Sequence, residues 1–108
     1  MNIPANISEN LRFLISEVSI QLKSLQIFLK APSSNLSKHI LDRSGYIFNL
    51  KSRIQNACTD MIQGKKYSPL LNNRFKVLDL IASDLEQIAE LCRGSVNLCH
   101  DYSCEQNS

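Results

Sequence analysis

The sequence predicts an all-α protein, an up-down-up antiparallel three-helix bundle, from three observations. Its 108 residues are enough for one domain and too few for two. The composition is 44% hydrophobic with only 3 Gly and 3 Pro, which supplies a core but not the turns of a β-sandwich. Large apolar residues recur at alternating steps of three and four, the spacing of one face of a helix. We therefore expect residues 1–108 to form a single three-helix domain.

The first helix is predicted over residues 8–31. Ser8 is a suitable N-cap, and Pro32 ends the helix because proline disfavours the helical conformation in the residue before it. Further apolar residues widen the stripe, which predicts a helix that is covered on two sides; they are Phe13, Ile20, Ile27 and Phe28. The predicted buried row is Leu11, Ile15, Val18, Leu22, Leu25 and Leu29.

The second helix is predicted over residues 35–63, capped by Ser34 or Asn35. Gly45 lies inside it and indicates a kink or a close helix crossing, since glycine costs about 1 kcal/mol there. Gly64 is expected to end the helix in the left-handed conformation. The predicted buried face is Leu36, Ile40, Ile47, Leu50, Ile54, Ala57 and Met61.

The third helix is predicted over residues 69–100, with Ser68 as cap and Pro69 in the first helical position. Short loops between long helices make neighbours antiparallel. Residues 101–108 are polar and are expected to form a frayed tail. The predicted buried row is Leu71, Phe75, Leu78, Ala82, Leu85, Ala89, Cys92, Val96 and Cys99.

The chain shows no signal for secretion or for a membrane span. Its N-terminus lacks a basic segment followed by an apolar run, and its longest strictly apolar stretches are three residues. We therefore expect a cytoplasmic protein with reduced thiols. No CxxC pair indicates a zinc site, so Cys58, Cys92 and Cys99 are assigned to packing and Cys104 to a free thiol.

Charge divides the chain into two unlike parts. Residues 38–76 hold eight basic and two acidic residues, a net +6, whereas residues 77–108 hold one basic and six acidic residues, a net −5. The two parts could neutralise each other within the bundle, or the acidic part could bind a cation or a basic partner. Asp79, Glu86 and Glu90 share one helix face, and two carboxylates one turn apart can share a divalent metal ion.

No pattern points to catalysis or to nucleic acid. No Glu is followed three residues later by His, as a di-iron bundle would require, and His39 and His100 have no partner pattern for acid–base chemistry. The basic residues are not interleaved with aromatic ones. The protein is therefore expected to be no enzyme, to bind no nucleic acid and to need no cofactor other than a divalent metal ion.

Residues 74–98 resemble the third helix of the PhoU-like phosphate regulators, which carries a DLERIGD-type core. The corresponding core here is Asp84–Glu90, with Asn97 and Leu98 after it. The lead-in at residues 67–70 is also similar to that family's loop. The resemblance implies that the metal motif of the family maps onto Glu86 and Glu90. Three positions depart from the pattern, namely Asn49, Gln87 and Ala89, and Glu90 replaces the usual aspartate.

PhoU-like proteins usually contain two three-helix units, and this chain has room for one. The sequence thus predicts a non-enzymatic PhoU-like regulatory or adaptor module, linked to phosphate transport or its signalling. It would dock a helical face onto a transporter, a kinase or a second copy, with a homodimer expected. The alternative is a metal-binding helical bundle that uses Asp79, Glu86 and Glu90 on the acidic face of the third helix.

Overall fold

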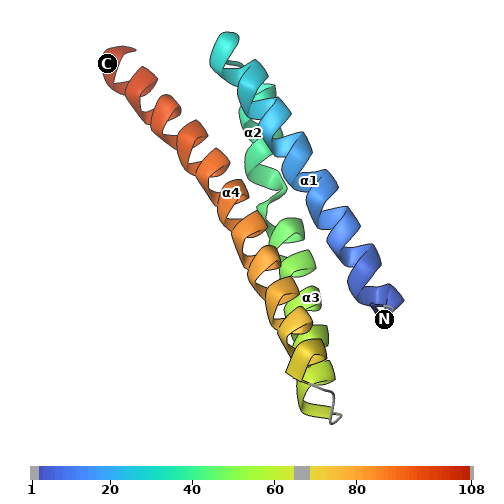
Figure 1. Cartoon of the computed structure of the whole chain (residues 1–108). Helices are drawn as coiled ribbons and strands as arrows, with labels where there is room; N and C mark the ends of the chain where they lie inside the picture. The colour runs from blue at the N-terminus through green and yellow to red at the C-terminus, as the bar shows by residue number, and fades with distance from the viewer. Residues whose placement is uncertain (1–2, 65–68, 108) are drawn as a thin grey trace.

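The structure, a computed structural model, describes residues 3–64 and 69–107, with side chains as far as residue 99. Four helices follow one another along the chain: α1 (Ala5–Lys30), α2 (Ser34–Asp42), α3 (Ser44–Gly64) and α4 (Pro69–Asn107). α2 and α3 run in the same direction and together form the second of three long segments (Figure 1). α1 and α4 run parallel to each other and antiparallel to that segment. The part of the chain that the structure describes is thus an all-helical, three-helix bundle without strands, as predicted.

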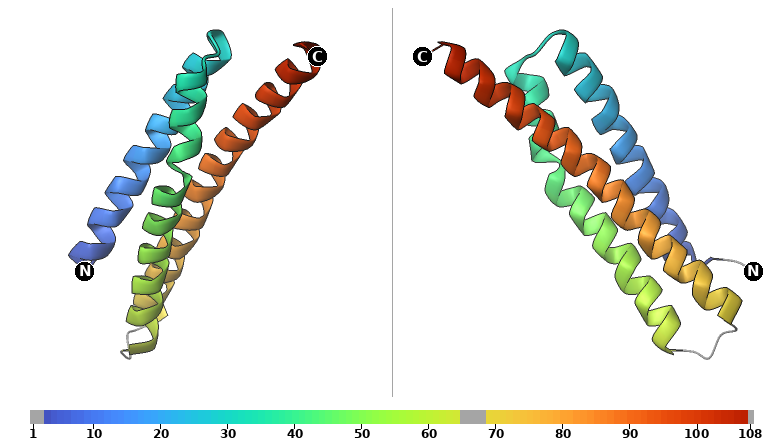
Figure 2. Two further views of the ribbon diagram at one scale, coloured as in Figure 1. Left: turned by 180° about the vertical axis from the view of Figure 1, so that it is seen from behind. Right: turned by 60° about the vertical axis from the view of Figure 1, so that its left-hand side comes forward.

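The bundle is a narrow rod of 61 × 19 × 18 Å whose core runs along its axis. α1, α3 and α4 all contact one another, and α4 diverges from the other helices towards its C-terminal end (Figure 2). A second, smaller cluster joins Phe28, Ile40 and Val96 near that end. None of the described helices has both the length and the apolar character needed to span a membrane. The main buried cluster consists of Ile7, Leu14, Val18, Ile47, Leu50, Ile54, Cys58, Phe75, Leu78, Ala82 and Ala89.

Two helices begin earlier than predicted. α1 begins at Ala5, because the carbonyl of Pro4 accepts hydrogen bonds from the backbone N–H groups of Ile7 and Ser8. Ser8 is therefore a residue of the first turn, not the cap. α2 is capped by Ser33, whose hydroxyl accepts a hydrogen bond from the Leu36 N–H at 3.2 Å. The predicted caps Ser34 and Asn35 lie inside the helix.

The predicted second helix is in fact two helices. The break falls at Arg43, which adopts φ −90° and ψ −4° between α2 and α3, two residues before the predicted kink at Gly45. Gly64 is the last residue of α3 but does not have a positive φ, so the left-handed ending is also wrong.

The third segment begins as predicted and ends later. α4 starts at Pro69, while the predicted cap Ser68 lies outside the described residues. The helix continues to Asn107, so the prediction of a frayed tail from residue 101 is wrong for residues 101–107. Its predicted row is confirmed in the middle of the helix, where six members are buried: Phe75, Leu78, Ala82, Ala89, Cys92 and Val96.

α1 buries only half of the row predicted for it: Val18 is buried, and Leu11 and Leu25 are partly buried, as predicted, but the other three members are not. Ile15, Leu22 and Leu29 are 47%, 47% and 58% exposed. The residues one position earlier in the chain are buried instead, namely Leu14, Gln21 and Phe28. Since successive residues are 100° apart on a helix, α1 is rotated by about that angle from its predicted orientation at these positions. Phe13, Ile20 and Ile27 are exposed as well, so the expected covering of α1 on two sides is also wrong.

The rotation of α1 predicts a contrast between two neighbouring residues. Leu14→Ala removes a fully buried side chain and should lower the free energy of unfolding by about 2–5 kcal/mol. Ile15→Ala, the matched control, should change it by about 0.5 kcal/mol or less, since Ile15 is half exposed. Urea denaturation of dilute protein measures both. If Ile15→Ala lowered the free energy of unfolding more than Leu14→Ala, the side of α1 predicted from the sequence would be the buried one after all.

Candidate functional site

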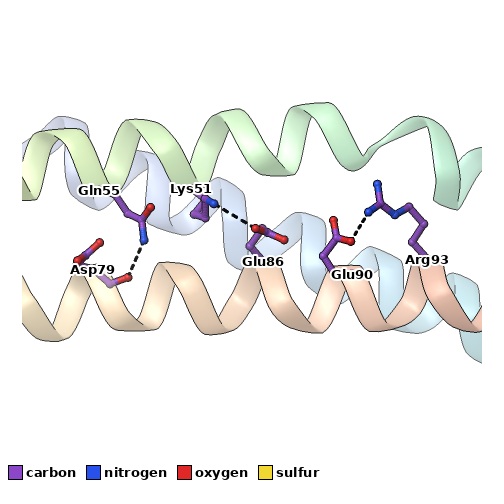
Figure 3. A network of polar contacts seen from close by, with 6 residues as sticks. All are labelled: Lys51, Gln55, Asp79, Glu86, Glu90 and Arg93. Carbon is purple, nitrogen blue, oxygen red and sulfur yellow. Dashed lines mark hydrogen bonds and ion pairs between the residues drawn. The ribbon is translucent and has the colours of Figure 1, made fainter.

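The three predicted metal ligands lie along one side of α4 and face α3. Figure 3 shows Asp79, Glu86 and Glu90 in a row, with Lys51 and Gln55 of α3 across from them. Their positions, seven and four residues apart, place them on the same helix face, as the sequence predicted. The row borders the packed contact between α3 and α4 and is half buried.

Glu86 forms an ion pair with Lys51 that links the two helices. The Lys51 ammonium donates to a Glu86 carboxylate oxygen at 3.2 Å, and the two side chains are 16% and 18% exposed. The same ammonium lies 4.4 Å from the centre of the Phe48 ring, one turn earlier on α3. The predicted neutralisation of an acidic helix by a basic one is thus confirmed for this pair.

The other two carboxylates are placed differently. Glu90 accepts a hydrogen bond from Arg93, three residues later on the same helix. Asp79 contributes its backbone carbonyl, which accepts a hydrogen bond from the Gln55 side-chain amide at 3.4 Å. Glu86 and Glu90 are therefore each paired with a cation of the chain itself, and the three carboxylates do not converge on one point (Figure 3).

This arrangement lacks the donor set of a metal centre. Within residues 3–64 and the described part of α4, no three His, Cys, Asp or Glu side chains are grouped closely enough to hold a metal ion. A divalent ion at Glu86 would also have to displace the Lys51 ammonium, because both cations would compete for the same carboxylate oxygen. The metal assignment of Asp79, Glu86 and Glu90 stays a prediction from the sequence.

Calorimetry decides between the ion pair and the metal ion. We expect titration of Mg²⁺ or Mn²⁺ into the protein to give no saturable heat, because Lys51 already neutralises Glu86. Lys51→Met and Glu86→Gln should then each weaken the bundle, by about 1 kcal/mol, and the double variant should cost less than their sum. Saturable binding that Glu86→Gln abolishes would establish the metal site instead.

A second polar cluster, which the sequence did not reveal, lies between α1 and the junction of α2 with α3. Glu17 is a buried carboxylate, and both of its oxygens accept hydrogen bonds from the Arg43 guanidinium. Gln21 is 1% exposed, and its amide donates to the Ile40 carbonyl at 3.4 Å. The bond to Glu17 raises the pKa of Arg43, whose guanidinium also lies 4.9 Å from the Tyr46 ring. The cluster joins three helices and is structural in character.

Cys58 is a buried thiol on α3. It is 1% exposed, and burial, with a smaller contribution from the negative charge of Asp79, raises its pKa to about 11. Burial also raises the pKa of Cys92. Both thiols are therefore protonated near neutral pH and are poor nucleophiles. The prediction that they serve packing is confirmed, whereas Cys104 and His100 lie outside the described side chains.

The raised pKa of Cys58 predicts a loss of stability at alkaline pH. The unfolded thiol deprotonates near its ordinary pKa of 9.0, and the folded one only near 11. The stability that the protonated thiol contributes is therefore complete below pH 9 and is lost as the pH rises to about 11, by roughly 2 kcal/mol. Cys58→Ala should lose less stability over the same range. Parallel stability–pH curves for the two proteins would contradict the assignment.

Large apolar side chains on the outside of the bundle are its most unusual surface feature. On α1 they form two exposed rows at seven-residue spacing, Phe13, Ile20 and Ile27 on one flank and Ile15, Leu22 and Leu29 on the other. On α4 the exposed residues are Leu70, Val77, Leu80, Ile81, Leu91 and Leu98. The sequence contains the signal for the α1 rows, but it did not show that they lack a cover within the chain.

Comparison of the chain with models of protein families, with curated proteins and with solved structures finds no match.

Proposed function

We propose that this chain is a non-enzymatic helical adaptor or regulatory module, which acts by docking a helical face onto a protein partner. One observation carries the proposal, namely the exposed apolar rows of α1 and α4. Ile15, Leu22 and Leu29 are about half exposed and recur every seventh residue, the spacing with which helices pack against other helices.

The energetic argument is that these side chains are stabilised little by the chain alone. Full burial of one Leu or Ile contributes about 1.5–3 kcal/mol, and on the isolated bundle roughly half of each of these side chains stays in water. Single exposed apolar residues are ordinary on a protein surface, but contiguous rows are typical of binding surfaces. A partner helix laid along such a row would gain the missing burial.

The proposed partners are a transporter, a kinase or a second copy of the chain. The link to phosphate transport or its signalling rests on the resemblance of residues 74–98 to the PhoU-like third helix. Glu86 of that segment pairs with Lys51, so its role within the chain is to hold α4 against α3. Under this proposal the acidic residues set the position of α4, and the apolar rows make the contact with the partner.

Complementation in cells tests the proposal. Cells that lack the protein should take up inorganic phosphate at an altered rate, and the wild-type chain should restore it. Leu22→Asp places a charge in an exposed row and should fail to restore uptake, although it leaves the core intact. Ser16→Asp, at an exposed polar position of the same helix, is the matched control and should restore it.

Two outcomes would contradict the proposal in different ways. Unchanged phosphate uptake in the cells that lack the protein would remove the link to phosphate. Full restoration by Leu22→Asp would remove the exposed row as the docking surface.

A further inference from the structure

A hollow of about 420 Å³ lies between α1 and α3, near the N-terminal end of α1. Its floor is apolar and includes Ile7, which is fully buried, and Met61, which is half-buried. An apolar floor with a few polar groups around it, at this volume, is typical of a site for a small polar ligand. We name the hollow the α1–α3 groove. Its polar walls consist of Asn6, Asn10, Arg53, Asn56 and Asp60.

The two charged residues of the groove lie at its opposite ends. Arg53 and Asp60 are seven residues apart on α3, which places their Cα atoms about 10 Å apart along the helix axis. Lys51 and Gln55 reach towards α4, so Arg53, which lies between them in the chain, faces away from α4. Within the described residues, neither Arg53 nor Asp60 has an ion-pair partner. Each charge is therefore available to a ligand.

Three carboxamide side chains accompany the two charges. Because α1 runs antiparallel to α3, Asn6 lies towards the Asp60 end of the groove and Asn10 towards the Arg53 end (Figure 1). The Asn10 side-chain nitrogen donates to the backbone carbonyl of Asn6 at 2.7 Å, which leaves the Asn10 side-chain oxygen as an acceptor. The side chains of Asn6 and Asn56 form no hydrogen bond with the described residues. The groove thus offers both the donors and the acceptors that a peptide bond requires.

The separation of the charges selects the length of the ligand. An extended chain advances about 3.3 Å per residue, so a tripeptide holds its terminal ammonium and carboxylate groups about 10 Å apart. This equals the separation of Arg53 and Asp60 along α3. A guanidinium binds a carboxylate through two parallel hydrogen bonds, and an aspartate accepts charge-assisted hydrogen bonds from an ammonium group. A single metal ion or phosphate would satisfy only one end of the groove.

We propose that the α1–α3 groove binds a short extended peptide of about three residues, with its carboxylate on Arg53 and its ammonium group on Asp60. The three carboxamides pair with the peptide bonds, and the apolar floor contacts the side chains of the ligand. The groove lies on the α3 side of α1, whereas Ile15, Leu22 and Leu29 lie on the flank that borders α4. The site is therefore separate from the apolar row that carries the proposed docking.

NMR titration of the 108-residue chain with trialanine tests the site. At about pH 6.5 both termini of trialanine are charged. We expect saturable shifts of the backbone amides along the groove, with a dissociation constant of about 1 mM, because the contacting side chains are largely exposed and their charges are screened by water. Residues near the other end of the bundle should not shift.

Blocked peptides and matched variants identify the two contacts. Arg53→Met should weaken the binding of trialanine roughly tenfold, yet leave unchanged the binding of trialanine amide, which has no carboxylate. Asp60→Asn should weaken trialanine similarly and leave N-acetyl-trialanine, which has no ammonium group, unchanged. Lys23→Met and Asp84→Asn are the controls, since both residues are exposed charges outside the groove, and should bind every peptide like the wild type.

Three results would overturn the inference. They are no saturable shift up to about 20 mM trialanine, equal affinity of the wild type for trialanine and its two blocked forms, and equal weakening of all three peptides by both groove variants. Leu22→Asp, which alters the row proposed for docking, should bind trialanine like the wild type. The proposed docking and the peptide site can therefore fail independently.

Discussion

The buried polar contacts of α1 constrain the rest of the molecule. Glu17 and Gln21 are both buried, and each needs a hydrogen-bond partner, because an unpaired buried charge or amide costs several kcal/mol. Arg43 and the Ile40 carbonyl supply those partners from the junction of α2 and α3. The chain meets this requirement in one orientation of α1 only, since turning the helix by one residue would carry both side chains away from the junction. The break between α2 and α3 serves the same contact, because Arg43 lies at the break and donates to Glu17.

The orientation of α1 decides which residues are available for function. With Glu17 and Gln21 held inwards, Ile15, Leu22 and Leu29 face outwards beside the exposed residues of α4. The polar contacts between α3 and α4, above all Lys51 with Glu86, hold the other side of the bundle together. The polar contacts thus hold the helices together, while apolar side chains on the outer flanks of α1 and α4 stay exposed. We regard these exposed apolar rows as the physical basis of the proposed docking.

Particular residues explain which parts of this structure could be predicted from the sequence and which could not. The three-helix architecture and the row of α4 were predictable, because Phe75, Leu78 and Ala82 have no competing apolar row of equal strength. On α1 two rows compete, and the row with Leu22 is more apolar than the row with Gln21, so hydrophobicity alone selects the wrong one. The partners that decide the matter, Arg43 and Ile40, are distant in sequence. The carboxylates of α4 were placed on the correct face, but their pairing with Lys51 and Arg93 depends on the register between helices, which periodicity does not contain.

A double-mutant cycle on Glu17 and Arg43 tests most directly the claim that this contact fixes the orientation of α1. The free energies of unfolding of Glu17→Gln, Arg43→Met and the double variant are compared with that of the wild type. The account predicts that Arg43→Met is the more damaging single change, since it leaves a buried carboxylate without its partner, and that the two residues are coupled by about 1 kcal/mol or more. Additive effects, equal within about 0.5 kcal/mol, would show that the pair does not hold α1 in place and would contradict the account.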